Sequence, residues 1–586
     1  MPSNAIYELV MSGKSVTTAM EQNPTKAVNE VAREVFPEKA RTATGKSKKL
    51  KTHEEYTQED LDRAAQCGKF PYRPSDLFLK IYVDVLDTLE HGPLKNMCSP
   101  SLMGSSGVVP ITVISLIPDI MRYYKDLIIN AQHEVILATN YWEQSWGSHF
   151  IHDAFIELSK RSEGRETKPV VKLVFDRGNP KQVIKNHQRV SPDDYEGLGL
   201  PTKDQVPHIY FEAMNYHRPI VGTFHAKYMV IDRRIACISS NNIQDRVNLE
   251  MNLHLEGPIV DAFYDMALLS WAERMDPPLP LLVNPGLRAK LGEGRDCFDD
   301  AKVRKTEMDN TSTSAIPEHP SPGSPESKKP MTDFTLINAE GFAPFVLHDR
   351  HDPVPIALVN RAPHGTPGHG DVDVPQNVAW LSGIRLAQKS VFIQTPDFNA
   401  EPVVEAIIDA CRRGVECTLY VCLGYNDQGE MLPMQGGTNS KIYAKMCQTL
   451  VKEGQDKRKF LKACWYTAKD RVQPIDAAAK ERNCHVKFCC IDEQVVIAGN
   501  GNQDTQSWYH SQEANVMVDS TQLAHDWLTA LNINQSTGQY GPVDEDGFWR
   551  DKDGNVVQSS GGTGGPIELA KGMMNAVARV QGKGGF

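Results

Sequence analysis

The sequence predicts an α/β protein made of two duplicated α/β domains, related by a pseudo-two-fold axis with the functional site on that axis. Two observations carry this prediction. A motif of the form His-x-Lys-x4-Asp occurs twice, as His225-Ala226-Lys227 with Asp232 and as His485-Val486-Lys487 with Asp492. The preceding sequence repeats too, because residues 130–139 (NAQHEVILAT) line up with residues 386–395 (LAQKSVFIQT). Chance rarely repeats both a motif and its flanking sequence, so the chain contains an internal duplication.

Helical and strand patterns follow one another in the same order in both copies. The repeated apolar segment is followed by a stretch with helical periodicity, then by apolar strand-like runs, and then by the motif. The expected helices are 151–161 and 401–413, and the expected strands are 170–175, 209–211, 417–423 and 464–466. Short β-branched and aromatic runs that alternate with helices predict α/β units with largely buried sheets.

The length of 586 residues accommodates two domains of about 200 residues each plus appendages. We expect a partly disordered N-terminal extension (1–90), a first repeat (91–290), a disordered linker (291–335), a second repeat (336–545) and a Gly-rich tail (546–586). The linker is charged and rich in Pro, Ser and Thr, a composition that cannot bury enough apolar surface to order itself. The tail contains a short amphipathic helix at 566–581, which either docks on the protein, frays, or lies on a membrane surface.

The composition limits the classes of function. The hydrophobic content of 40% indicates a globular protein, and no segment approaches the ~18 apolar residues of a membrane span. The formal net charge of −11 opposes a broad electrostatic surface for nucleic acid, so no nucleic-acid partner is expected. The twelve cysteines lie mostly in apolar strand-like runs, which indicates reduced thiols. Residues 1–24 lack the apolar core of a secretory signal, so we expect a cytoplasmic protein that contacts membranes peripherally.

Strand geometry separates the motif residues into two groups. In a strand, residues two apart point to the same face, so His225 and Lys227 share one face and the second copy behaves alike. The aspartates lie at an odd offset from the histidines, which sends them to the opposite face. We therefore expect Asp232 and Asp492 to form structural pairings beneath the site.

The remaining residues suit phosphate chemistry. Two lysines, together with Asn242 and Asn502 at equal distances after the two motifs, can supply positive charge and neutral donors to the non-bridging oxygens of a phosphate. One histidine can attack phosphorus while the other delivers a proton to the departing alkoxide. A nucleophilic imidazole needs its other nitrogen hydrogen-bonded, and Glu250 and Glu513 are the natural partners.

No cofactor or metal is expected. The two lysines replace the positive charge of the metal ion that many phosphoryl-transfer sites use. The segment 484–490 is rich in Cys and His, but strand alternation places His485 and Cys489 on one face and Cys484 and Cys490 on the other. A tetrahedral zinc site from that segment is therefore not expected.

With these motifs the chain resembles the phospholipase D superfamily, whose members carry two His-Lys-Asp motifs. The likeness covers about 111–271 and 378–519. It implies two phospholipase D-like α/β/α sandwich domains with the active site at their interface. It also implies a covalent phosphohistidine on the histidine of the N-terminal motif, which would make His225 the nucleophile and His485 the general acid and base. The symmetry of the sequence alone does not distinguish the two histidines.

Three further features concern the branch within this superfamily. Residues 499–507 (GNGNQDTQS) resemble the second motif of bacterial-type cardiolipin synthases and related phosphatidyltransferases, whereas 239–242 (SSNN) lack the two glycines of the family pattern. Tyrosyl-DNA phosphodiesterases generally lack the motif aspartates, so their retention here favours the lipid-type branches. A loop at 360–371, with His364 and His369, either lines the entrance to the site or is a plain surface loop.

The resemblance implies a phospholipase D-type phosphodiesterase or transphosphatidylase that acts on glycerophospholipids. Its expected partners are a phospholipid membrane surface and a water or small alcohol acceptor. One alternative is a nuclease of the same fold, which the acidic composition disfavours. The other is a catalytically decayed phospholipid-binding scaffold, against which the intact set of site residues argues.

Overall fold

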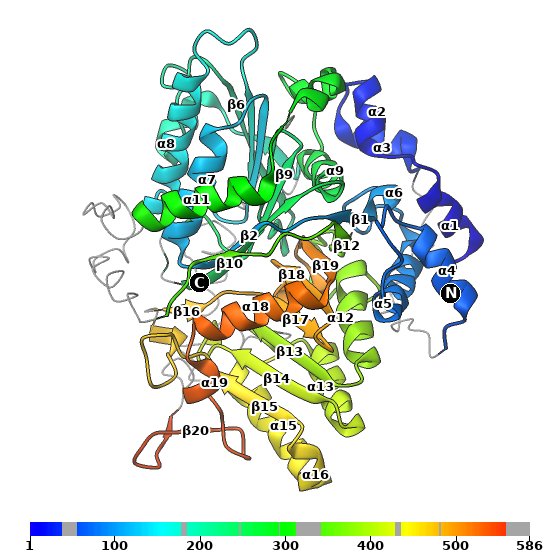
Figure 1. The fold of residues 1–586 in the computed structure, drawn as a ribbon, viewed down its shortest axis with the longest axis vertical. Coiled ribbons are helices and arrows are strands. Elements are labelled where there is room, and N and C mark those ends of the chain that lie inside the picture. The colour runs from blue at the N-terminus through cyan, green and yellow to red at the C-terminus, as the bar shows by residue number, and fades with distance from the viewer. Residues whose placement is uncertain are drawn as a thin grey trace.

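The computed structural model describes residues 1–37, 55–176, 185–244, 246, 248–291, 294–311, 341–427, 435–479 and 482–557. Two large mixed sheets, each covered by helices, occupy opposite ends of an elongated molecule (Figure 1). The predicted α/β class is therefore confirmed.

The first sheet is formed mainly by the first repeat. Its strands are β2 (Ile111–Ser115), β3 (Glu134–Thr139), β4 (Val170–Phe175), β5 (His187–Arg189), β6 (Tyr210–Arg218), β7 (Gly222–Thr223), β8 (Tyr228–Ile231), β9 (Ile235–Ser239), β10 (Asn248–Glu256) and β11 (Phe345–Leu347). They pair in the order β11-β2-β10-β9-β8-β3-β4-β6-β5, with β7 beside β6.

The second sheet repeats this arrangement. Its strands are β1 (Gly104–Gly107), β12 (Val354–Leu358), β13 (Ser390–Thr395), β14 (Glu416–Val421), β15 (Leu461–Trp465), β17 (Phe488–Ile491), β18 (Val495–Gly499) and β19 (Asn515–Asp519), while β16 (Asn483–Cys484) pairs with β10 of the first sheet. The order β12-β19-β18-β17-β13-β14-β15 matches β2-β10-β9-β8-β3-β4-β6 strand for strand. The same order in both sheets is what an internal duplication predicts.

The two sheets exchange edge strands. The chain passes through β1 before it enters the first sheet at β2, yet β1 pairs antiparallel with β12 of the second sheet. Conversely, β11 pairs with β2 before the chain enters the second sheet at β12. Sequence-based boundaries at 91 and 336 assign each strand to the repeat that follows it, whereas the structure places each in the sheet of the other repeat. Each exchanged strand covers an edge that would otherwise expose unpaired backbone groups.

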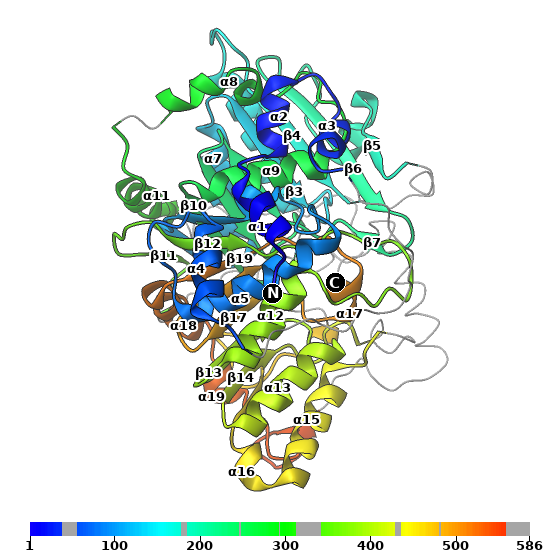
Figure 2. The same cartoon turned by 90° about the vertical axis from the view of Figure 1, so that its right-hand side faces the viewer.

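Helices cover both faces of the sheets (Figures 1 and 2). The longer ones are α5 (Asp76–Asp87), α7 (Ile117–Ile129), α8 (Trp146–Arg161), α9 (Ile259–Trp271), α11 (Cys297–Thr311), α12 (Pro375–Leu386), α13 (Glu401–Arg413), α15 (Asn439–Glu453) and α18 (Thr521–Ile533). The outer core of the first half involves α7 and α8, and that of the second involves α5, α12 and α13. A central core joins the halves, with Trp271 of α9 and Trp527 of α18 among its fully buried side chains.

The N-terminal extension contributes helices to both halves. Its short helices are α1 (Asn4–Met11), α2 (Val16–Gln22), α3 (Val28–Val35) and α4 (Gln58–Gln66). Helices α2 and α3 pack against α9, and α5 packs against α12. Part of the predicted linker is helical as well, because α11 buries Phe298, Ala301 and Met308. The rest of that linker at 312–335 and the amphipathic segment at 566–581 lie outside the described residues.

Two whole-chain expectations concern membranes and thiols. In the described part of the chain, no helix is long and apolar enough to cross a membrane. All twelve cysteines are free thiols, and all except Cys297 are buried.

Candidate active site

Each motif enters a tight hairpin at the centre of its sheet. His225 and Lys227 directly precede β8, which turns into β9, and the second motif directly precedes β17 and turns into β18. The turn residues have left-handed backbone, with φ of 50° at Asp232 and 51° at Asp492. Consecutive residues with positive φ fit the two-residue turns that match the twist of a hairpin. The turn therefore lies at one end of the strand and the histidine at the other.

The two aspartates hold neighbouring strands rather than the reacting centre. Asp232 accepts hydrogen bonds from the backbone N–H groups of Gln132 at 2.7 Å, His133 at 2.7 Å and Glu134 at 2.9 Å, at the start of β3. Asp492 accepts the equivalent bonds from residues 388–390 at the start of β13. Since strand β8 separates Asp232 from His225, this arrangement agrees with a structural role beneath the site.

Each histidine pairs with a glutamate of the other repeat. The Nδ1 atom of His225 lies 2.8 Å from Oε2 of Glu513, and Nδ1 of His485 lies 3.1 Å from both carboxylate oxygens of Glu250. The backbone sets this exchange. The N–H of His225 donates to the carbonyl of Gln512 at 3.0 Å, and that of His485 donates to Leu249 at 2.8 Å. Neither repeat therefore contains a complete histidine–carboxylate pair of its own.

The two lysines lie buried beside the histidines. Lys227 and Lys487 are each 1% exposed, and each Nζ donates to the carbonyl oxygen of its own motif's histidine at 2.6 Å. An ammonium group has three donors, and among the described residues this is the one hydrogen bond that each makes. The remaining donors are available to the oxygens of a bound phosphate.

The two asparagines are also buried, at 1% exposed for Asn242 and 4% for Asn502. In the described ranges, the Oδ1 atom of each has no hydrogen-bond partner, while Nδ2 of Asn502 donates to Asp504 at 3.1 Å. Buried polar atoms are nearly always paired, so unpaired ones at a site indicate a ligand-facing position. For Asn242, rotation of the amide exchanges its oxygen and nitrogen, which would present a donor in the same place.

Sequence reasoning missed Asn500, which joins the two repeats. Its Nδ2 donates to the carbonyl of Ser239 at 2.5 Å and to that of Lys227 at 3.1 Å, while its Oδ1 accepts from the N–H of Lys227 at 3.1 Å. The two glycines that flank it lie against backbone and side chain: a Cβ on Gly499 would lie 2.3 Å from the carbonyl oxygen of Ala514. The glycine-rich segment after the second motif was the signal for this close approach.

The first repeat uses Ser240 where the second uses Asn500. Ser240 Oγ donates to Glu250 Oε2 at 2.5 Å and accepts from the N–H of Met251 at 2.9 Å. It thus holds the carboxylate that orients His485. Residues 239–242 lack glycines because Ser240 bonds within its own repeat, whereas Asn500 reaches the backbone of the other repeat.

Burial lowers the pKa of both histidines and of Lys487. It lowers the pKa of His225 well below 6.5, with Lys227 and Lys487 adding repulsion, and it lowers the pKa of His485 to about 4 against the attraction of Glu250. Burial likewise lowers the pKa of Lys487 to about 8. In the unliganded site both imidazoles are therefore neutral at neutral pH.

The pKa values of the two glutamates shift in opposite directions. Burial raises the pKa of Glu513 to about 8 against the attraction of Lys227. Burial also acts to raise the pKa of Glu250, but the charge and hydrogen bond of His485, together with Lys487 and Ser240, hold it below its usual value. Glu250 is therefore the more acidic of the two carboxyl groups, and it faces His485.

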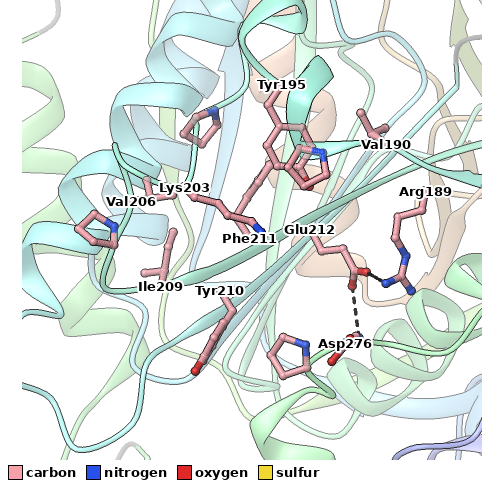
Figure 3. A pocket seen from close by; sticks show the side chains of 14 residues that line it. Arg189, Val190, Tyr195, Lys203, Val206, Ile209, Tyr210, Phe211, Glu212 and Asp276 are labelled. Carbon is pink, nitrogen blue, oxygen red and sulfur yellow. Dashed lines mark hydrogen bonds and ion pairs between the residues drawn. The ribbon is translucent and has the colours of Figure 1, made fainter.

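No group of three or more His, Cys, Asp or Glu side chains in the described part of the chain could hold a metal ion. A separate cavity of about 410 Å³ lies at the β6 edge of the first sheet (Figure 3). Glu212, which lines this cavity, forms ion pairs with Arg189 and with the buried Lys172. The lining contains none of the motif residues, so this cavity is distinct from the candidate active site.

Residues 381–532, which contain the second motif, match the family model described as the cardiolipin synthase, phospholipase D-like domain. The matched segment is therefore similar to a phospholipase D-like domain, and the first repeat carries the same His-x-Lys-x4-Asp motif. None of the curated proteins matches the chain.

Several solved structures are similar to the chain. Phosphatidylserine synthase from Haemophilus influenzae Rd KW20 is 13% identical, over 82% of this chain and 96% of that one, with a TM-score of 0.46. The phospholipase D family member Nuc from Salmonella typhimurium is 13% identical, over 35% of this chain and 98% of that one, with a TM-score of 0.23. NucT from Helicobacter pylori is 16% identical, over 28% and 89%, with a TM-score of 0.21.

Proposed function

We propose that this protein is a phosphodiesterase or phosphatidyltransferase that acts on glycerophospholipids through a covalent phosphohistidine. The observation that carries the proposal is the reciprocal pairing of His225 with Glu513 and of His485 with Glu250, beside two buried lysines. A phosphodiester held between the imidazoles would meet a nucleophile on one side and a proton donor on the other.

In the first step, Nε2 of His225 attacks phosphorus while the bond from phosphorus to the head-group oxygen breaks. His485, protonated with the bound anion beside it, gives its Nε2 proton to the departing alkoxide. Lys227 and Lys487 compensate the charge on the non-bridging oxygens. In the second step, water or an alcohol attacks phosphorus, His485 takes its proton, and the phosphorus–nitrogen bond breaks. The products are phosphatidic acid or a new phosphodiester.

The difference between the two histidine–glutamate pairs supports this assignment of roles. A general acid needs a partner that stabilises its protonated form, and the pKa of Glu250 beside His485 is lowered. A nucleophile must be neutral, and the pKa of His225 lies well below its usual value. His225 is accordingly proposed as the nucleophile and His485 as the general acid and base.

Charge supports a lipid substrate. The formal net charge is −11, while the site concentrates two lysines in a buried position. This combination suits a single phosphodiester presented at a surface better than a polyanion gripped along its length. We propose a phospholipid membrane surface as the partner, a water or small alcohol as the acceptor, and a cytoplasmic location. The lysines supply the charge that a metal would bring, so turnover is expected to survive EDTA.

The test is mass spectrometry of lipids after incubation of the purified protein with mixed liposomes, with and without glycerol. We expect head-group release, and a new phosphatidyl ester when glycerol is present, because the phosphohistidine can meet either acceptor. His225→Ala serves as the inactive control. Release of no head group from any common phospholipid would overturn the proposal. DNA cleavage would then favour the nuclease alternative, and liposome binding without turnover would favour the scaffold.

A further inference from the structure

A buried arginine beside the active site lacks a counterpart. Arg361 follows β12 and is 1% exposed. Across the described residues, its Nε and Nη1 atoms have no hydrogen-bond partner, and its guanidinium forms no ion pair. Arginine is almost never fully buried unless it is paired, because an uncompensated charge in a low-dielectric interior is strongly unfavourable. Such a group points to an anion that binds there.

The backbone places Arg361 next to the carboxylate that orients His225. Arg361 and Glu513 exchange two backbone hydrogen bonds, each of 3.1 Å, as a directly opposed antiparallel pair. Residues opposed in this way project their side chains from the same side of the ribbon, with Cα atoms about 5.5 Å apart. Since Glu513 points at His225, the side chain of Arg361 leaves the backbone on the active-site side as well. It makes no ion pair with Glu513, whose Oε2 is taken by His225.

The first repeat has a serine, not a cation, at the corresponding described position. In the corresponding register, Glu250 is opposed by Ser115, whose hydroxyl donates to Asp119 at 2.5 Å. By contrast, the histidine, lysine and asparagine proposed to hold the scissile phosphate occur in both repeats. Arg361 therefore serves a part of the substrate that differs between the two sides of the pseudo-two-fold axis.

The loop that follows Arg361, together with His510, places imidazoles near its guanidinium. The loop after it stacks the rings of His364 and His369, with centroids 3.5 Å apart, and the N–H of His364 donates to the carbonyl of His510 at 2.7 Å. Burial, with Arg361 contributing, lowers the pKa of His369 and of His510 to about 4, so both are neutral at neutral pH.

Arg361 itself stays charged. Burial lowers its pKa only to about 10, with Asp371 and Glu513 opposing the shift. Asp371, the acid that most opposes this shift, has a partner of its own, because its Oδ2 lies 3.7 Å from Nζ of Lys95. Neutral imidazoles and a charged guanidinium together form a group of donors suited to an anion.

We propose that Arg361 binds a second anionic group, a carboxylate or a second phosphate, on the polar part of the lipid substrate. The proposal rests on the proposed function and narrows it to lipids whose head group carries an anion beyond the scissile phosphate. A planar guanidinium can donate two parallel hydrogen bonds to either group, which a lysine cannot. The loop at 360–371 would then line the site.

The binding test uses inorganic anions and needs no turnover. By calorimetry, the wild-type protein should bind pyrophosphate about tenfold or more tightly than orthophosphate, since a charge-assisted hydrogen bond is worth at least this factor. Arg361→Gln should lose that preference, and Arg361→Lys should keep part of it. Equal binding of the two anions by the wild type overturns the proposal, whether or not the variants fold.

The turnover test compares head groups in otherwise identical liposomes. Phosphatidylserine tests a carboxylate, cytidine diphosphate-diacylglycerol tests a second phosphate, and phosphatidylethanolamine has no further anion. We expect Arg361→Gln to lower kcat/KM by roughly tenfold or more on the preferred anionic lipid and to change it little on phosphatidylethanolamine. An unchanged ratio between these lipids overturns the proposal.

The matched control is Arg458→Gln. Arg458 is also buried, but its guanidinium donates to the carbonyls of Leu461, Asp544 and Glu545. Arg458→Gln should lower thermal stability. It should leave intact both the preference for pyrophosphate over orthophosphate and the preference for the anionic lipid over phosphatidylethanolamine. If no lipid is turned over yet pyrophosphate binds through Arg361, the anion site stands and the proposed function fails.

Discussion

At the scale of residues, the site depends on charges that are buried and shared between repeats. Glu250 and Glu513 are both fully buried, and each faces a histidine supplied by the other half. Lys227 and Lys487 each donate to the carbonyl group of their own motif's histidine, so one short segment positions both an imidazole and an ammonium group. Burial makes each of these groups sensitive to its neighbours, because charges interact strongly where water is excluded.

Replacement of the histidines should separate their roles. His225→Ala and His485→Ala should each lower kcat by roughly a thousandfold or more, since nucleophile and acid act as a unit. With an activated leaving group that needs no proton, His485→Ala should still form a trapped phosphoenzyme, detectable by intact-protein mass spectrometry. His225→Ala should form none. The opposite trapping pattern would make His485 the nucleophile.

The pH dependence should report Lys487. Its pKa is lowered to about 8 by burial, so the ammonium form is present below that pH and is lost above it. We expect kcat/KM to fall as pH rises through 8, in a series of initial rates on one lipid. Lys487→Arg should move this fall to higher pH, because the guanidinium keeps its proton, although its different shape should lower the rate. A fall in Lys487→Arg at the same pH as in the wild type would show that another group is responsible.

At the scale of elements, the hairpins explain why aspartate belongs to the motif. Asp232 sits in a left-handed turn and collects three backbone N–H groups at the start of β3, and Asp492 does the same for β13. The motif thus joins its own hairpin to the neighbouring antiparallel strand. In this way the aspartate sets the position of β8 against β3 without touching the reacting atoms.

Loss of this contact should cost stability rather than chemistry. Asp232→Ala leaves three N–H groups without their acceptor, which should lower the free energy of unfolding by about 3 kcal/mol. Urea unfolding measures this, and kcat per folded molecule should stay within a few-fold of wild type. Asp232→Asn should lose less, because asparagine tolerates left-handed backbone and keeps one acceptor. Wild-type stability with lost kcat would instead place Asp232 in the chemistry.

At the scale of the whole molecule, the two repeats form one unit. They share a central core around α9 and α18, exchange the edge strands β1 and β11, and cross-pair β10 with β16. The candidate active site takes each of its histidine–glutamate pairs from both repeats. A site assembled from both halves suits a substrate that fits between them, and the formal net charge of −11 disfavours a polyanion.

Substrate choice should follow from this distribution of charge. Measured side by side at about 0.15 M salt, where surface charges are largely screened, the purified protein should turn over a glycerophospholipid and act far more weakly on single-stranded DNA or RNA. His225→Ala identifies any contaminating nuclease. Strong DNA cleavage with no head-group release would assign the chain to the nuclease branch of its superfamily.

Much of this could be predicted from the sequence, because it is local or repeated. Periodicity identified the helix at 401–413 and the strand at 170–175 with the bounds the structure shows. The duplicated motif singled out the histidines and lysines that lie close enough to shift one another's pKa, and the odd offset separated the aspartates from them. Composition suggested a disordered linker and did not predict α11. The low apolar content of that segment hides three apolar residues of α11 that are buried against the rest of the protein.

The tertiary structure alone decided the pairings between distant segments. Sequence symmetry treats Glu250 and Glu513 alike and does not say which histidine each serves; the cross-pairing of His225 with Gln512 and of His485 with Leu249 settles that exchange. The tertiary structure alone also decided three other features. These are the bridge made by Asn500, the exchange of β1 and β11, and the unpaired charge of Arg361. The physical reason is that a repeat encodes its own periodicity, whereas contacts between repeats depend on how two buried surfaces fit together in space.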